Sequence, residues 1–209
     1  MTPAPAARGI MGSMSPPAHE IDSPSSWVCR WAGLIRPGGR VLDVACGHGR
    51  HLRYLESLGF AVVGVDRDEA AVGAFKGVGG VEIHVADIEA GSWPFAAAAF
   101  DGVIVTNYLW RPLFPNLVEA LRSGGVLIYE TFALGNERYG RPSNPAFLLR
   151  PNELLHSVEP LAVVAFEQGL IAAPKPAVVQ RVCAVLGDSA PVSLDAAPPR
   201  AGGQAVALE

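Results

Sequence analysis

The stretch VLDVACGHGRH, residues 41–51, decides the fold of this chain. An apolar run carries an acid, Asp43, and then breaks into Gly-X-Gly at Gly47 and Gly49. Glycines after a strand let the backbone turn tightly and approach a ligand, because a Cβ atom would clash there. In an open α/β sheet, ligands bind beside such turns at the carboxyl ends of the strands. The stretch therefore predicts a first strand followed by a nucleotide-binding turn.

Outward from this turn, short apolar runs alternate with helical patterns. Strands are predicted at 41–45, 61–66, 81–87, 100–108, 126–132, 161–169 and 177–186, and helices at 50–59, 68–76, 113–125 and 151–158. Asp68 is placed to cap its helix, and Gly59 to end the preceding one. The alternation predicts an α/β, doubly wound, mostly parallel seven-stranded sheet. The last two strands are joined without a helix, so the last strand is expected to be antiparallel.

Composition limits the classes of function. Of the 209 residues, 50% are hydrophobic and the net charge is -4, with no basic run that would track a phosphate backbone. No nucleic acid partner is expected, and no apolar run has membrane-spanning length. Cys29, Cys46 and Cys183 are far apart, which predicts neither a disulfide framework nor a metal site and fits a cytoplasmic protein.

Both ends of the chain differ from its middle. Residues 1–25 and 187–209 are rich in small residues and proline without periodicity, and we expect a mobile N-terminal arm and a disordered tail. The folded domain is predicted at 26–186. Methionine occurs at positions 1, 11 and 14, which raises the hypothesis that translation starts at Met14 rather than at Met1 or Met11.

The second predicted strand ends in Asp66, where a carboxylate can accept hydrogen bonds from both hydroxyls of a ribose. This fits NAD and other adenosine cofactors alike. Against NAD, Leu52 stands where the dinucleotide fingerprint has its third glycine. Asp43 would repel a pyrophosphate but attract an ammonium or sulfonium group, which favours S-adenosylmethionine. We also expect Asp43 to hydrogen-bond the backbone of its own turn.

The run from Asp43 to Gly49 resembles the first motif of the class I S-adenosylmethionine-dependent methyltransferases. Asp66 matches their ribose-binding acid, and Asp87 with Ile88 matches their adenine-binding pair. TNY at 106–108 and SGGVLIYETF at 123–132 match the later motifs, so that the resemblance covers roughly residues 27–186. It implies a cofactor site of Asp43, Ala45, Cys46, Gly47, Gly49, Asp66, Arg67, Asp87, Ile88, Thr106 and Asn107. The nearest subgroup resembles the small tellurite-resistance-type methyltransferases.

The resemblance implies transfer of a methyl group to a small-molecule acceptor by in-line displacement, which leaves S-adenosylhomocysteine. Holding the reactants in line can lower the barrier by about 7–11 kcal/mol, so a dedicated base is needed only for a protonated acceptor. The long segment after the fifth strand, 131–150, is interpreted as a substrate lid. Candidate catalytic residues are Tyr108, Arg138, Tyr139 and Arg141. Arg138 or Arg141 is expected to meet an anionic group, although both could equally form surface salt bridges.

Other interpretations stay open. The chain could be a non-catalytic S-adenosylmethionine-binding sensor or scaffold, or an NAD-dependent oxidoreductase; an RNA or protein methyltransferase lacks the basic face it would need. Several residues have structural interpretations. Cys46 is better explained as a small residue in a tight turn than as a reactive thiol. Asp101 is better explained as an acid in a turn than as a catalytic residue. His48 and His51 fit solvent-facing or capping roles better than metal binding, and Trp27 and Trp31 either pack or line the cofactor site. The oligomeric state is not predicted.

Overall fold

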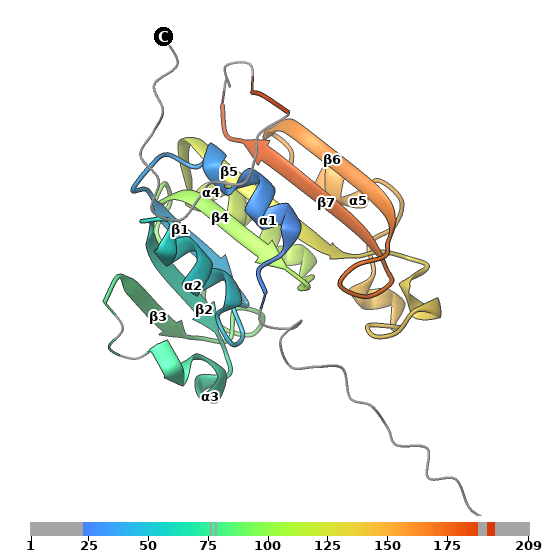
Figure 1. Cartoon of the computed structure of the whole chain (residues 1–209), viewed down its shortest axis with the longest axis horizontal. Helices are drawn as coiled ribbons and strands as arrows, with labels where there is room; N and C mark the ends of the chain where they lie inside the picture. Colours follow the sequence, from blue (N-terminus) through green and yellow to red (C-terminus); the bar gives the residue numbers. More distant parts are fainter. Residues whose placement is uncertain (1–22, 76, 78, 188–191, 195–209) are drawn as a thin grey trace, which may run out of the picture.

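In the part of the chain that the structure describes, seven strands form one mixed sheet in the order β3-β2-β1-β4-β5-β7-β6 (Figure 1). The computed structural model describes residues 23–75, 77, 79–187 and 192–194. The strands are β1 (Arg40–Val44), β2 (Ala61–Asp66), β3 (Val81–Val85), β4 (Phe100–Thr106), β5 (Leu121–Phe132), β6 (Ala162–Ile171) and β7 (Ala177–Val185). The first five pair in parallel, and β7 runs antiparallel to both β5 and β6. The predicted doubly wound α/β sheet with its antiparallel last strand is confirmed.

Helices cover both faces of this sheet. They are α1 (Ser26–Trp31), α2 (Arg50–Ser57), α3 (Glu69–Val72), α4 (Phe114–Ala120) and α5 (Glu153–Ser157). Side chains of α1, α2 and α3 pack in one hydrophobic cluster, and those of α4 and α5 pack in a second cluster. Figure 1 shows α1 and α2 in front of the sheet, with α4 and α5 behind it.

The central strands are buried on both faces, as their continuous apolar runs predict. Every residue of β4 from Phe100 to Val105 is buried, and so is β2 from Val62 to Val65. At the sheet edge, every residue of β3 is half-buried or exposed, and Val85 is 47% exposed. The carboxyl ends of β1, β2 and β4 therefore lie in the middle of the molecule, held by the best-packed strands.

The helix predicted at 113–125 is wrong beyond Ala120. Leu121 has the extended angles φ -77° and ψ 140°, and it pairs with Phe100 at the start of β5. The register between β4 and β5 then shifts, because residues 122–125 bulge out before Val126 pairs with Gly102. Arg122 fixes this bulge by donating hydrogen bonds to the Ala98 carbonyl and the Asp101 carboxylate. Tertiary contacts of this kind override a helical pattern that ends in two glycines.

Local predictions elsewhere agree with the structure. The Asp68 carboxylate accepts hydrogen bonds from the backbone N–H groups of Ala70 and Ala71, which confirms the predicted cap of α3.

Trp27 and Trp31 are buried with their rings 5.6 Å apart, and the Trp27 indole donates to the Val182 carbonyl. Their role is packing of α1 on the sheet.

Most of the predicted arm and tail lies outside the described residues, and the limits 26–186 of the folded domain stay a prediction. Residues 23–25 of the predicted arm are described, and Ser25 is buried as the cap of α1. None of the described helices is long and apolar enough to cross a membrane.

Candidate functional site

The turn after β1 has the left-handed backbone that its glycines predict. Ala45, Gly47 and Gly49 have φ values of 53°, 51° and 69°. The Cys46 N–H donates to the Val65 carbonyl at 3.1 Å, and the Gly49 N–H donates to the Cys46 carbonyl at 2.9 Å. These bonds fold the turn against the end of β2 before α2 begins.

The two glycines of the turn have different surroundings. A Cβ atom on Gly49 would overlap the Phe75 ring, so close packing as well as the positive φ requires glycine there. A Cβ atom on Gly47 would have no atom within 4 Å, because this residue faces open space. Gly49 therefore fixes the packing of the turn, and Gly47 keeps its outer side accessible.

Asp66, the last residue of β2, is connected to this turn. Its Oδ2 accepts a hydrogen bond from the Gly47 N–H at 2.8 Å, and its Oδ1 accepts one from the Asp68 N–H at 2.9 Å. Each carboxylate oxygen can accept a second bond, so the group keeps the capacity to bind ligand hydroxyls. The half-buried Asp66 is thus held in one orientation beside the turn.

Asp87 lies after β3, one strand further along the sheet. Its Oδ1 accepts hydrogen bonds from the Glu89 and Ala90 N–H groups at 2.9 and 3.1 Å. These backbone bonds hold the pKa of the exposed Asp87 carboxyl below its usual range. Asp87 is therefore a fixed, ionised acceptor, and Ile88 beside it supplies an apolar surface.

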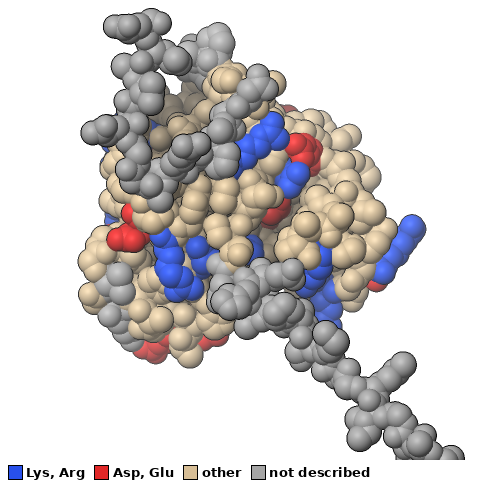
Figure 2. All heavy atoms as spheres, in the orientation of Figure 1, with Lys and Arg blue, Asp and Glu red and all other residues tan. Residues whose placement is uncertain are grey.

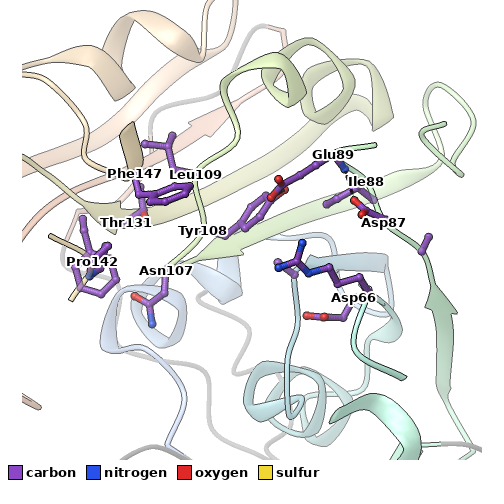
Figure 3. A pocket seen from close by; sticks show the side chains of 14 residues that line it. Asp66, Asp87, Ile88, Glu89, Asn107, Tyr108, Leu109, Thr131, Pro142 and Phe147 are labelled. Carbon is purple, nitrogen blue, oxygen red and sulfur yellow. Dashed lines mark hydrogen bonds between the residues drawn. The ribbon is translucent and has the colours of Figure 1, made fainter. Parts of the chain in front are cut away.

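Asp66 and Asp87 line the same cavity, whose volume is about 370 Å³. Its walls are formed by Ala45, Asp66, Arg67, Ala86, Asp87, Ile88, Glu89, Asn107, Tyr108, Leu109, Thr131, Phe132, Pro142 and Phe147. Figure 3 shows the two acids and Ile88 on one side, Asn107, Thr131 and Pro142 on the other, and Tyr108 between them. We name this space the first cavity.

Two neighbouring residues after β4 form the middle of this wall. Asn107 has a φ of 56° and donates its N–H to the Glu130 carbonyl at 2.9 Å. The Tyr108 hydroxyl donates to Glu89 Oε1 at 3.2 Å, and the Tyr108 carbonyl accepts from the Tyr129 hydroxyl at 2.8 Å. Burial raises the pKa of the Tyr108 phenol, so it stays protonated at neutral pH. Tyr108 is consequently a hydrogen-bond donor and an aromatic wall.

Other predicted site residues do not line the first cavity. Cys46, Gly47 and Gly49 shape the turn, and Thr106 ends β4. Of the candidate catalytic residues, Arg138, Tyr139 and Arg141 are exposed, and none of them lines this cavity. The segment 131–150 reaches the cavity instead through Thr131, Phe132, Pro142 and Phe147. Sequence reasoning missed these four because it looked for charged side chains.

The expectation that Asp43 hydrogen-bonds its own turn is wrong. Neither carboxylate oxygen has a hydrogen-bond partner among the described residues, and the Asp43 side chain is 1% exposed. Burial raises the pKa of Asp43 to about 8, with Arg50 and Asp66 contributing smaller, opposite effects. Asp43 therefore lies beneath the turn as a neutral acid at pH 7, outside the walls of the first cavity.

His51 is not solvent-facing, which corrects the sequence interpretation. It is 2% exposed, its Nε2 accepts a hydrogen bond from the Ser25 N–H at 3.1 Å, and its Nδ1 lies 3.8 Å from Asp43 Oδ2. Burial lowers the pKa of His51 to about 3, so the ring is neutral. His48 is exposed, as expected. Among the residues the structure describes, no three His, Cys, Asp or Glu side chains gather as metal ligands.

Cys46 and Asp101 have structural surroundings. Burial raises the pKa of the Cys46 thiol, which keeps it in its unreactive protonated form. Asp101 accepts from the Arg40 N–H at 2.8 Å and pairs with Arg36 and Arg122. Asp101 is thus a structural acid, but it lies within β4 and not in the predicted turn.

A family model described as a methyltransferase domain matches residues 41–125, from the turn-bearing β1 to the bulge in β5. This part of the chain thus matches a methyltransferase domain, and the fold of the chain is the class I fold of solved methyltransferases. The methyltransferase domain superposes on the crystal structure of TehB from Haemophilus influenzae with a TM-score of 0.67 and 18% identity, covering 78% of this chain and 63% of that one. A methyltransferase structure from Methanosarcina mazei gives a TM-score of 0.62 and 15% identity over 78% and 98% of the two chains. At such low identities, these superpositions show a shared fold alone. Together with the matching family model, they confirm the predicted resemblance.

A curated relative of the methyltransferase domain is a tRNA U34 carboxymethyltransferase of Methylococcus capsulatus. It is 34% identical over 146 residues, which are 60% of this chain and 45% of the relative. The chain thus matches less than half of the length of this relative.

The family and the solved neighbours indicate S-adenosylmethionine as the cofactor of the methyltransferase domain, as predicted. The first cavity fits this molecule chemically. Asp66 and Asp87 are acceptors for ribose hydroxyls and an adenine amino group, and Ile88 and Leu109 are apolar surfaces for a ring. The open side of Gly47 leaves room for the methionine part beside the turn.

The structure has a second cavity of about 280 Å³ that sequence reasoning missed. It is lined by Ser23, Pro24, Ser25, Ser26, Arg50, Asn107, Glu130, Phe132, Ile171, Ala173, Pro174, Lys175, Ala177, Val179 and Arg181. Asn107 and Phe132 line both cavities, so the two spaces adjoin. No sequence pattern joins these residues, because they come from the start of α1 and the segment before it, from α2, from the loop after β4, from β5, and from β6 and β7 with their connection.

Proposed function

We propose that this chain is an enzyme that transfers a methyl group from S-adenosylmethionine to a small-molecule acceptor by in-line displacement. One observation carries the proposal: Asp66 ends β2, Asp87 follows the neighbouring parallel strand β3, and both line one cavity beside a left-handed glycine turn. This is the position where an open α/β sheet binds a nucleoside.

The residues of the chain bind and orient rather than react. S-adenosylmethionine, when bound, supplies a methyl group already activated by a positively charged sulfur. Asp66 and Asp87 would hold the ribose and adenine, and Asn107 and Tyr108 would separate the cofactor from the acceptor side. The protonated Tyr108 phenol donates to Glu89, which supports a positioning role for it rather than that of a base.

The size and charge of the walls support a small acceptor. Phe132, Pro142 and Phe147 line the first cavity, whose volume of about 370 Å³ is in the range of small-molecule sites. Figure 2 shows the Lys and Arg side chains of one face at several separate places rather than in one continuous patch. A polynucleotide would need such a patch.

RNA is the second candidate acceptor, and the name of the 34%-identical relative supports it. The net charge of -4 weighs against it. A filter-binding assay with bulk tRNA at low salt separates the two candidates, since tight binding would favour RNA.

Calorimetric titration with S-adenosylmethionine, S-adenosylhomocysteine and NAD tests the cofactor part of the proposal. We expect micromolar binding of the first two, none of NAD, and loss of binding in Asp66→Ala. Glu119→Ala on the exposed side of α4 is the matched control, because it removes one negative charge far from both cavities. Tight binding of NAD without S-adenosylmethionine would instead support an oxidoreductase.

A non-catalytic sensor needs the same cofactor contacts, so binding alone does not separate it from an enzyme. The discriminating measurement is formation of S-adenosylhomocysteine in the presence of a panel of small acceptors. Turnover with any of them supports the enzyme, whereas tight cofactor binding with no turnover across a broad panel supports the sensor.

A further inference from the structure

The second cavity is lined by four charged residues that the cofactor contacts do not use, Arg50, Glu130, Lys175 and Arg181. We propose that it is the acceptor subsite and that it binds a small anion with an apolar body, such as a hydrophobic carboxylate. This inference rests on the proposed function, because it names the class of acceptor for the same reaction.

Unpaired positive charge carries the proposal. Arg50 and Lys175 both line the second cavity, and neither has a carboxylate partner within 4.0 Å among the described residues. Within the described residues, the hydrogen bond of the Arg50 guanidinium is a long one of 3.4 Å to the Ser23 carbonyl, and the Lys175 side chain is exposed. Two cations at one concave wall attract a single anion more strongly than they attract a neutral molecule of equal size.

The acid in this cavity is already neutralised. Glu130 accepts a hydrogen bond from the Ser25 hydroxyl at 2.8 Å and pairs with Arg181 at 3.2 Å. Arg181 in turn also pairs with Glu167. Glu130 and Arg181 therefore form a fixed, internally paired wall, so that the excess charge of the cavity comes from Arg50 and Lys175.

Part of the remaining wall is apolar, beside the polar Ser23, Ser25, Ser26 and Asn107. Phe132, Ile171, Ala177 and Val179 line the second cavity, and Ala177 and Val179 are buried. A strongly hydrated ion such as phosphate would gain nothing from this surface, whereas a hydrocarbon body would lose contact with water there. Because Asn107 and Phe132 are shared with the first cavity, an acceptor held here lies next to the cofactor cavity.

An anion at this place has two sources. It could belong to the acceptor, as we propose, or it could be the carboxylate of the cofactor's own methionine part. Arg50 follows the turn directly and could serve either source. Lys175 comes from the connection between β6 and β7, which lines the second cavity but not the first, and its substitution therefore separates the two sources.

The test measures binding to protein saturated with S-adenosylhomocysteine. The probes are three matched pairs, namely benzoate and benzamide, phenylacetate and phenylacetamide, and hexanoate and hexanamide, each titrated by calorimetry. We expect at least one acid to bind about tenfold more tightly than its amide. Lys175→Ala should remove this preference and leave the affinity for S-adenosylhomocysteine within about twofold. Arg36→Ala, which removes the same charge near the opposite ends of the strands, should keep the preference.

Each other outcome overturns the inference. Acids and amides that bind alike, or six probes that all fail to bind, show that the cavity does not select anions. If Lys175→Ala weakens S-adenosylhomocysteine as much as it weakens the acids, the anion belongs to the cofactor. Failure of the wild-type protein to bind S-adenosylhomocysteine would instead count against the proposed function itself.

Discussion

The Gly47 N–H donates a hydrogen bond of 2.8 Å to Oδ2 of Asp66, which ties the turn after β1 to the carboxyl end of β2. The same carboxylate holds the Asp68 N–H at the start of α3. Asp66 thus has two functions, since it organises the backbone on both sides and presents its remaining acceptor capacity to the first cavity. A substitution at this residue tests both of them.

Replacement of Asp66 by Asn and by Ala should separate the two functions. Asn keeps only one of the two oxygen acceptors, so it loses the charge and one backbone bond. It should weaken S-adenosylhomocysteine binding by about tenfold or more and lower the free energy of unfolding less than Ala does. Ala removes both backbone bonds and should also lower the free energy of unfolding by about 1–3 kcal/mol. Calorimetry and urea denaturation measure the two effects. Equal stability of the two variants would show that the backbone bonds contribute nothing.

The glycines of the turn should differ in their tolerance of alanine. Gly47→Ala introduces only left-handed strain, because nothing lies within 4 Å of the new Cβ, and should cost about 1–2 kcal/mol. Gly49→Ala adds overlap with the Phe75 ring, which should lower the free energy of unfolding by about a further 1–3 kcal/mol. Urea unfolding of both variants measures the difference. Equal losses would mean that Phe75 moves aside freely.

The parts of the fold and site that could be predicted from the sequence are those that depend on local periodicity. The buried strands and the acids that end β2 and follow β3 are in their predicted places, because strand order places these ends side by side. The failures all depend on tertiary contacts. Arg122 and Asp101 convert the end of a predicted helix into a bulge, and Ser25 buries His51. The second cavity collects residues from separate segments, so no local pattern could have indicated it.

Asp43 and His51 should give stability an unusual dependence on pH. Burial raises the pKa of Asp43 from 3.8 to about 8, so between these values the folded state binds more protons and the free energy of unfolding falls as pH rises. Burial lowers the pKa of His51 from 6.5 to about 3, which makes stability rise with pH up to 6.5. The two effects oppose each other below pH 6.5, and only that of Asp43 remains between pH 6.5 and 8.

The prediction is therefore a loss of stability between pH 6.5 and 8, with a slope of at most about 1.4 kcal/mol per pH unit. Asp43→Asn, which mimics the neutral acid, should abolish this loss in urea titrations across the interval. His51→Gln, which keeps an acceptor for the Ser25 N–H, should retain it. Parallel curves for wild type and Asp43→Asn would show that Asp43 is ionised throughout.

Arg111 in the 3₁₀ helix η4 (Arg111–Leu113) should control the order of the segment 142–149. Its guanidinium donates to Glu153 and to the carbonyls of Ala146 and Leu148, at 2.7 and 3.0 Å for the carbonyls. A lysine keeps the charge but has no planar fork, so Arg111→Lys should lose about 1.5–3 kcal/mol of local stability.

Hydrogen exchange measures this loss directly, because the Leu149 N–H donates to the Phe132 carbonyl and reports on the attachment of the segment to β5. We expect Arg111→Lys to speed its exchange by roughly 10–100-fold. Arg150→Ala is the matched control, since the exposed Arg150 side chain also pairs with Glu153, at 3.8 Å, yet has no bond to Ala146 or Leu148. Phe147 lines the first cavity, so a loosened segment should also weaken ligand binding there. Unchanged exchange in Arg111→Lys would mean that the Ala133–Leu149 bridge holds the segment by itself.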